Sequence, residues 1–124
     1  MSGTPLSQHI YVRRLLAAYR KTPCASGLVR PADRLLAARL HQRGVLIDVV
    51  ENAFVLATAR RLYRKDPTAP PLPPATSLHY FLPVIDELSR TAISPAYFHH
   101  LRYRIATFEE AKHAFLQSLQ KPQS

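Results

Sequence analysis

The sequence predicts an all-α protein, a single domain of residues 1–124 built from four to five helices. Ala, Leu and Arg dominate its 124 residues, all three favour helix, and glycine occurs only three times. Apolar residues recur at spacings of three and four along several segments, the period of a helix with one buried face. A hydrophobic fraction of 47% is typical of a chain that folds around a core.

Composition also limits the compartment and the chemistry. The chain has no apolar stretch of about 18 residues, so no membrane span is expected. The N-terminal residues lack the order of charged and apolar regions that marks a signal peptide, which favours the cytoplasm. A single cysteine, Cys24, excludes an internal disulfide.

The first two helices have clear boundary signals. Residues 7–21 form an amphipathic segment with Ser7 as its N-cap. After a loop, the second helix starts at Pro31, a residue that suits the first helical position, and Asp33 favours the positive end of the helix dipole. Gly44 is placed to end this second helix.

The third helix follows at once and carries the broadest apolar sector, as expected for the centre of a bundle. Together with the second helix it is predicted to make a helical hairpin over residues 31–65, or a corner like that of a helix-turn-helix, joined at Gly44. The apolar positions predicted for the core are Leu15, Leu16, Tyr19 and Ile10 in the first helix, Leu35, Leu36 and Leu40 in the second, and Ile47, Val50, Phe54, Val55, Ala57, Ala59 and Leu62 in the third.

Residues 66–75 contain five prolines and are predicted to form an extended strap, an internal linker in a polyproline II-like conformation. A semi-rigid spacer is the simpler interpretation, and a proline-rich ligand for an SH3-type groove is the alternative. A helix over residues 77–90 follows, with Ser77 or Thr76 as its cap. Pro83 either begins a helix after a short turn or kinks a single helix near its first turn.

The last segment predicts a long helix over residues 94–119, capped by Ser94 and followed by a frayed tail at 120–124. Two arrangements are compatible with this helix: it packs across the domain, or its C-terminal half projects and pairs with another copy. Its apolar stripe at alternating spacings of three and four consists of Phe98, Leu101, Ile105, Phe108, Phe115 and Leu119.

Charge is the strongest functional signal. Seventeen Lys and Arg face eight Asp and Glu, a formal net charge of +9 that favours polyanionic partners and nucleic acid above all. Arginine interleaved with tyrosine suits contact with phosphates beside stacked bases or sugars, although solvated helix faces would show the same pattern. The predicted nucleic-acid-binding residues are Arg60, Arg61, Arg64 and Lys65 at the end of the third helix, Arg102, Tyr103 and Arg104 on the last, and Arg13 and Arg14 on the first.

Residue patterns for catalysis or metal binding are missing from the sequence. Its six histidines lack the spacing of a metal-binding helix, its adjacent carboxylates do not converge on one point, and its glycines form no phosphate loop. We therefore expect no enzyme, no catalytic residues, no metal and no cofactor. An enzyme would need His79 or His99 to join a carboxylate in a pocket.

In residues 43–88 a glycine precedes a helix of the form xxxVVxxAxxxA, and an aromatic YFxxVI segment comes after a gap. This layout resembles the C-terminal module of DnaD-type replication proteins. The same layout is similar to small helical proteins of bacterial mobile or replication loci. This resemblance implies DNA binding in replication. The matching residues are Gly44, Val50, Ala53 and Ala57 in the first part and Tyr80, Val84 and Ile85 in the second.

Together these features predict a non-enzymatic, basic nucleic-acid-binding accessory protein of replication or mobile-element maintenance. Its ligand is expected to be DNA rather than RNA, bound mainly through phosphates. The alternative is a protein–protein adaptor or assembly subunit that docks, or forms a homodimer, through residues 98–119 of the long helix.

Overall fold

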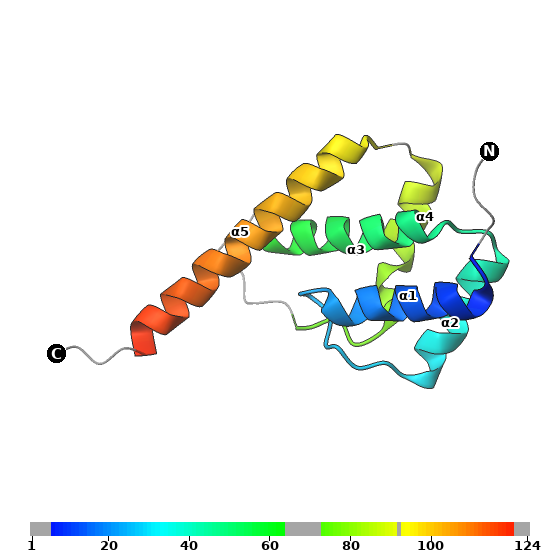
Figure 1. The fold of residues 1–124 in the computed structure, drawn as a ribbon, viewed down its shortest axis with the longest axis horizontal. Helices are drawn as coiled ribbons and strands as arrows, with labels where there is room; N and C mark the ends of the chain where they lie inside the picture. Colours follow the sequence, from blue (N-terminus) through cyan, green and yellow to red (C-terminus); the bar gives the residue numbers. More distant parts are fainter. Residues whose placement is uncertain (1–5, 64–72, 92, 121–124) are drawn as a thin grey trace.

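A computed structural model describes residues 6–63, 73–91 and 93–120 of the chain. These residues form five α-helices and one 3₁₀ helix, without a strand, so the predicted all-α domain is confirmed (Figure 1). In chain order the elements are α1 (Gln8–Lys21), α2 (Pro31–Gln42), α3 (Ile47–Leu62), η1 (Leu78–Phe81), α4 (Leu82–Arg90) and α5 (Pro95–Gln120).

The helix boundaries follow the local signals in the sequence. Ser7 caps α1, and its hydroxyl oxygen accepts a hydrogen bond from the Ile10 N–H at 3.3 Å. Pro31 is the first residue of α2. Gly44 adopts a φ of 78°, a left-handed conformation that only glycine reaches without strain, and this turn joins α2 to α3. Helix α2 packs mainly against α1 and not against α3, so the two helices meet at Gly44 in a corner, one of the two predicted arrangements, rather than in a packed hairpin.

Only the end of the predicted strap, residues 73–75, lies within the described part of the chain, and residues 66–72 lie outside it. At this end Ala75 pairs with the loop that follows α1. Its N–H donates to the Cys24 carbonyl at 2.7 Å, and its own carbonyl accepts from the Ser26 N–H at 2.8 Å. This single parallel bridge fastens the chain after the prolines to the chain after α1.

Pro83 lies in the second position of α4, directly after η1. The N–H groups of a helix's first turn have no partner inside that helix, so a proline there loses no hydrogen bond. The short turn followed by a new helix, one of the two predicted outcomes, is therefore confirmed. Ser77 precedes η1, and its hydroxyl accepts from the His79 N–H.

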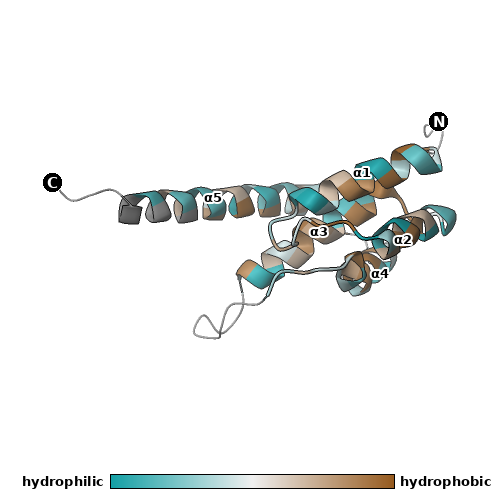
Figure 2. Cartoon of the chain, turned by 90° about the horizontal axis from the view of Figure 1, so that it is seen from below, coloured by the Kyte–Doolittle hydropathy of each residue, from teal (hydrophilic) through white to brown (hydrophobic). Residues whose placement is uncertain are grey.

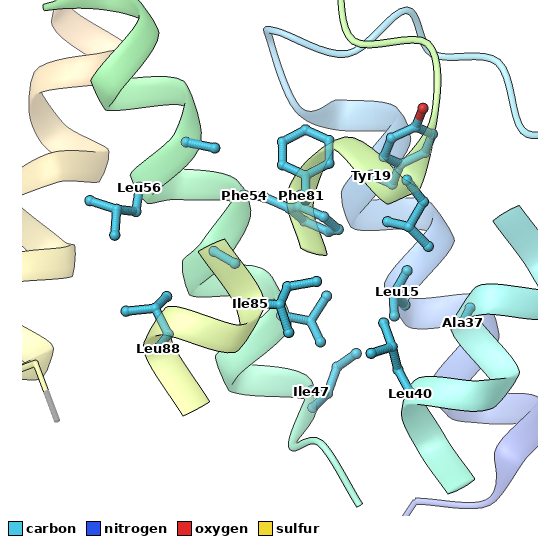
Figure 3. Close-up of a cluster of buried hydrophobic side chains, with 14 of the residues drawn as sticks. Leu15, Tyr19, Ala37, Leu40, Ile47, Phe54, Leu56, Phe81, Ile85 and Leu88 are labelled. Atoms are coloured by element: carbon cyan, nitrogen blue, oxygen red, sulfur yellow. The ribbon is translucent and has the colours of Figure 1, made fainter. Parts of the chain in front are cut away.

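The core lies between α1, α2, α3, η1 and α4 (Figure 3). Phe54 of α3 and Phe81 of η1 meet edge to face with ring centroids 4.9 Å apart, and Tyr19 of α1 packs against both rings. Ile85 and Leu88 extend this cluster along α4. The aromatic segment after the proline strap is thus what closes the α1–α3 layer.

Two predicted core residues are wrong. Ile10 is 50% exposed and Leu35 is 61% exposed, whereas Tyr11, next to Ile10, is buried. Successive residues point about 100° apart on a helix, and on α2 Leu36 faces the core while Leu35 faces solvent. Tyr11 donates its hydroxyl hydrogen to the Val45 carbonyl at 2.7 Å, and burial raises the pKa of Tyr11 to about 12.

Asp33 is a buried carboxylate that joins distant parts of the chain. One oxygen accepts from the Arg30 N–H just before α2, and the other accepts from the Leu78 N–H of η1, both at 2.9 Å. Only 1% of Asp33 is exposed. Asp33 therefore caps α2 and also fixes the start of η1, 45 residues away in sequence.

Helix α5 begins against the body and ends away from it. Phe98 and Leu101 are buried, Ile105 is half-buried, and Phe108 is already 38% exposed. Beyond this point the helix extends past the other elements as an arm (Figures 1 and 2). The C-terminal half of α5 therefore projects, and its pairing with another copy stays a prediction. Within the described residues, no helix combines the length and apolar character that crossing a bilayer requires.

Candidate nucleic-acid interface

A groove of about 590 Å³ between α1 and α2 gathers four arginines. Arg13, Arg14 and Arg20 come from α1, and Arg34 comes from the first turn of α2, with Leu16 and Ala17 between them. Residues 13, 17 and 20 recur at spacings of four and three, which places them on one side of α1. We call this feature the arginine groove.

Three of its four arginines have no hydrogen-bond or ion-pair partner in the described chain. Arg13, Arg20 and Arg34 are exposed, and none makes a side-chain hydrogen bond or ion pair with another residue of the described chain. Arg14 differs, because it donates to both carboxylate oxygens of Glu51 at 2.8 and 3.1 Å and lies 3.5 Å from Asp48. The groove therefore carries three guanidinium groups that no acid of the described chain neutralises.

The α3 arginines predicted as the main binding cluster are held by the protein itself. Arg60 makes a two-bond contact with the Glu87 carboxylate of α4, at 2.7 and 2.8 Å. This hydrogen bonding, aided by the charge of Arg60, holds the pKa of Glu87 below its ordinary value. Arg61 donates to the Pro73 carbonyl and to the Tyr80 hydroxyl, and its guanidinium lies over the Tyr80 ring.

Of the three predicted residues of α5, two contact other parts of the protein and one is exposed to solvent. Arg102 donates to the side-chain oxygen of Asn52 at 2.8 Å, and Arg104 lies 4.2 Å from the centre of the Tyr63 ring. Tyr103 is 69% exposed. Arg60, Arg61, Arg102 and Arg104 each bind another element, so we call them the anchored arginines.

Two other predicted residues, Arg64 and Lys65, lie outside the described residues. The structure thus brings Arg13 and Arg14 together in the arginine groove, and it disperses the other described members over α3 and α5. Sequence analysis missed Arg34, because only the packing of α2 against α1 brings it beside Arg13 and Arg20. Arg20 had a signal available, its place seven residues after Arg13 on the same helix face.

The described residues bring no set of reactive side chains together in a site. They hold no cluster of three or more histidine, cysteine, aspartate or glutamate residues that could bind a metal ion. The His79 ring contacts the Ser77 hydroxyl at 3.2 Å, and His99 is exposed. Neither histidine pairs with a carboxylate of the described chain.

Comparison with known proteins gives no relative: no protein-family model, curated protein or solved structure matches this chain. The DnaD-like resemblance over residues 43–88 therefore stays a prediction. Most of the residues that carry it serve the core, since Val50, Ala53 and Ile85 are fully buried. These buried residues therefore belong to the contact between α3 and α4, and not to a surface that could bind a ligand.

Proposed function

We propose that this protein is a non-enzymatic nucleic-acid-binding accessory protein that holds phosphates in the arginine groove. One observation carries the proposal: Arg13, Arg20 and Arg34 line one groove without an acid partner in the described chain. Guanidinium groups bind phosphate through paired hydrogen bonds, and their charge is not lost at any ordinary pH.

The net charge of +9 supports a polyanion as the ligand. A single small anion would be satisfied by one or two arginines, whereas a groove along α1 fits a chain of regularly spaced phosphates. Binding to phosphates alone carries little sequence preference, so affinity should depend mainly on salt. DNA is the proposed ligand over RNA, and a role in replication or mobile-element maintenance rests only on the DnaD-like resemblance.

The anchored arginines support the groove as the main contact. Arg60 would have to give up two hydrogen bonds to Glu87 before it could bind phosphate in the same way. If Arg60 exchanged the Glu87 carboxylate for a phosphate, little net free energy would be gained. An unpaired guanidinium at the surface would give up only bound water when it binds phosphate. The groove residues therefore contribute more affinity for each charge.

The test compares two triple variants of equal charge. Replacing Arg13, Arg20 and Arg34 by Gln removes three cations from the groove, and replacing Arg60, Arg61 and Arg104 by Gln removes three anchored ones. Affinity for a DNA oligonucleotide is measured by fluorescence anisotropy at several salt concentrations. The groove variant should lose about 2.7 from the log–log salt slope on duplex, or about 2.1 on a single strand.

The anchored variant should keep most of that slope, because its arginines are engaged within the protein. Equal losses in both variants would show that net charge alone determines binding and that the groove has no special role. Absence of binding by the wild-type protein at low salt would overturn the proposed function itself.

A second candidate, a protein–protein adaptor, is favoured by the projecting arm of α5. Helix α5 packs against α3, and the residues after Ile105 are mostly exposed where they are described. An adaptor or homodimer would use this arm while the groove remained free. Sedimentation of the wild-type protein and of a chain ending at Thr107 distinguishes these cases, since only arm-mediated assembly is lost on truncation.

A further inference from the structure

A second hollow, of about 550 Å³, lies where α5 crosses the body and is formed by α1, α3 and α5. Its walls are apolar, with Phe54 and Val55 from α3 and Ile105 and Ala106 from α5. Two cations, Lys21 and Arg102, stand among its lining residues. We call it the α5 pocket.

The α5 pocket and the arginine groove share α1 as their common wall. Ala17 and Arg20 line the groove, whereas the next residues, Ala18 and Lys21, line the pocket. A step of one residue turns about 100° around a helix, so the two hollows open on adjacent sides of the C-terminal half of α1. A strand that lies along the groove reaches the pocket by crossing one helix.

From this juxtaposition we infer that the α5 pocket accepts an unpaired base of a single-stranded nucleic acid whose phosphates lie in the arginine groove. This inference rests on the proposed function and adds the form of the ligand. A base has flat apolar faces that fit walls such as the half-buried Val55 and Ile105, and its flanking phosphates can meet Lys21.

Charge and polarity favour this occupant over an apolar peptide. A hydrophobic side chain would fill the walls but would leave the exposed ammonium group of Lys21 without an anionic partner, while Arg102 stays bound to Asn52. Two half-buried carboxylates also line the pocket. Glu51 is paired with Arg14, whereas Glu109 can accept a hydrogen bond from an N–H group at the edge of a base. A paired base inside a duplex presents neither a free face nor a free Watson–Crick edge to such a pocket.

The test uses two single-stranded oligonucleotides with the same number of phosphates, about twelve nucleotides long, within the usual range of site sizes. One carries thymine at every position and the other is abasic throughout. If a base enters the pocket, the thymine strand should bind roughly tenfold more tightly, as expected for one stacked base.

A matched pair of substitutions places this preference in the pocket. Ala106→Phe fills the pocket from an exposed position on α5, and Ala114→Phe makes the same change two turns further along, outside the pocket lining. The preference for thymine should disappear in A106F and persist in A114F. Circular dichroism of both variants shows that each keeps its helices, since neither position is buried.

The results separate this inference from the proposed function. Equal binding of the thymine and abasic strands would overturn the pocket as a base site and leave the groove as the phosphate site. A preference for thymine that survives A106F would also overturn it. Failure of the wild-type protein to bind either strand would also overturn this inference, and failure to bind duplex DNA as well would overturn the proposed function.

Discussion

The arginine groove and the anchored arginines contain the same residue type in two different states. Arg13, Arg20 and Arg34 have no polar partner within the described chain, whereas Arg60 and Arg61 bind side chains of other elements. In the sequence the second set is the denser cluster and the more persuasive one. A cluster of basic residues in the sequence therefore does not show which of them can bind a ligand. That depends on which side chains the fold leaves without a partner.

The anchored arginines act as fasteners between elements. Arg60 joins α3 to α4 through Glu87, and Arg61 joins α3 to the chain around Pro73 and Tyr80. Such contacts lie on the surface, where each contributes little to stability, but they favour one relative placement of the helices. Arg13, Arg20 and Arg34 have no such role, so they should respond differently to mutation.

The largest loss of stability is expected on replacing a buried acid, Asp33, against which the changes at surface arginines can be compared. Asp33→Ala leaves the N–H groups of Arg30 and Leu78 without an acceptor in a buried site. The free energy of unfolding should fall by about 3 kcal/mol, because each unpaired buried donor costs on the order of 1–3 kcal/mol. Urea denaturation followed by circular dichroism measures this loss.

Asp48→Ala is the matched control for Asp33. Its side chain is 79% exposed and approaches Arg14 only at 3.5 Å, so the free energy of unfolding should change by less than about 0.5 kcal/mol. A loss for D33A as small as that for D48A would mean that the Asp33 carboxylate does not hold α2 and η1 together.

An intermediate effect is expected from Arg60→Gln, and it should depend on pH. Because the folded pKa of Glu87 is lowered, its contact with Arg60 stabilises the fold above the ordinary value of 4.5. This contribution is lost as the pH falls from 4.5 through the folded pKa. The Tm of R60Q should lie below that of wild type at neutral pH, and the difference should narrow in acid.

Arg39→Gln provides the control for R60Q, since Arg39 is exposed and its side chain makes no hydrogen bond with the described residues. Its Tm should follow that of the wild type across the same pH range. If the difference between R60Q and wild type stayed constant down to about pH 3, the stabilisation would not come from the ionised carboxylate.

The smallest effect on stability is expected where the effect on binding is largest. The triple variant R13Q/R20Q/R34Q should unfold within about 0.5 kcal/mol of the wild type, because these side chains touch no partner in the described chain. Relief of repulsion between three neighbouring cations acts in the stabilising direction. A loss above about 1 kcal/mol in chemical denaturation would place the groove arginines among the anchored ones.

Local signals in the sequence predicted the fold well, because caps and breakers act within a few residues. Ser7 and Pro31 begin α1 and α2, Gly44 ends the turn after α2, and Pro83 lies in the first turn of α4 as anticipated. Failures arose where a choice depends on distant contacts. Leu35 was expected in the core, but the side of α2 that faces α1 selects Leu36.

The candidate site could be predicted only in part for the same reason. Arg13 was identified on α1, whereas Arg34 joins it only through the packing of two helices that a loop separates. Arg60 and Glu87 form an ion pair although they lie 27 residues apart in the sequence, so no local pattern could predict it. Charge patterns therefore locate cations along the chain, while tertiary packing decides which remain available.

The bridge at Ala75 has a consequence for how the chain can be divided. A run of prolines between two helical stretches looks like a natural place to separate independent units. Here, however, Phe81 from the later stretch packs against Tyr19 and Phe54 from the earlier one. The backbone hydrogen bonds of Ala75 also hold the start of the later stretch against the loop after α1. Two fragments cut between residues 63 and 73 would each expose half of a shared interior, so they should recover native structure only by complementing one another.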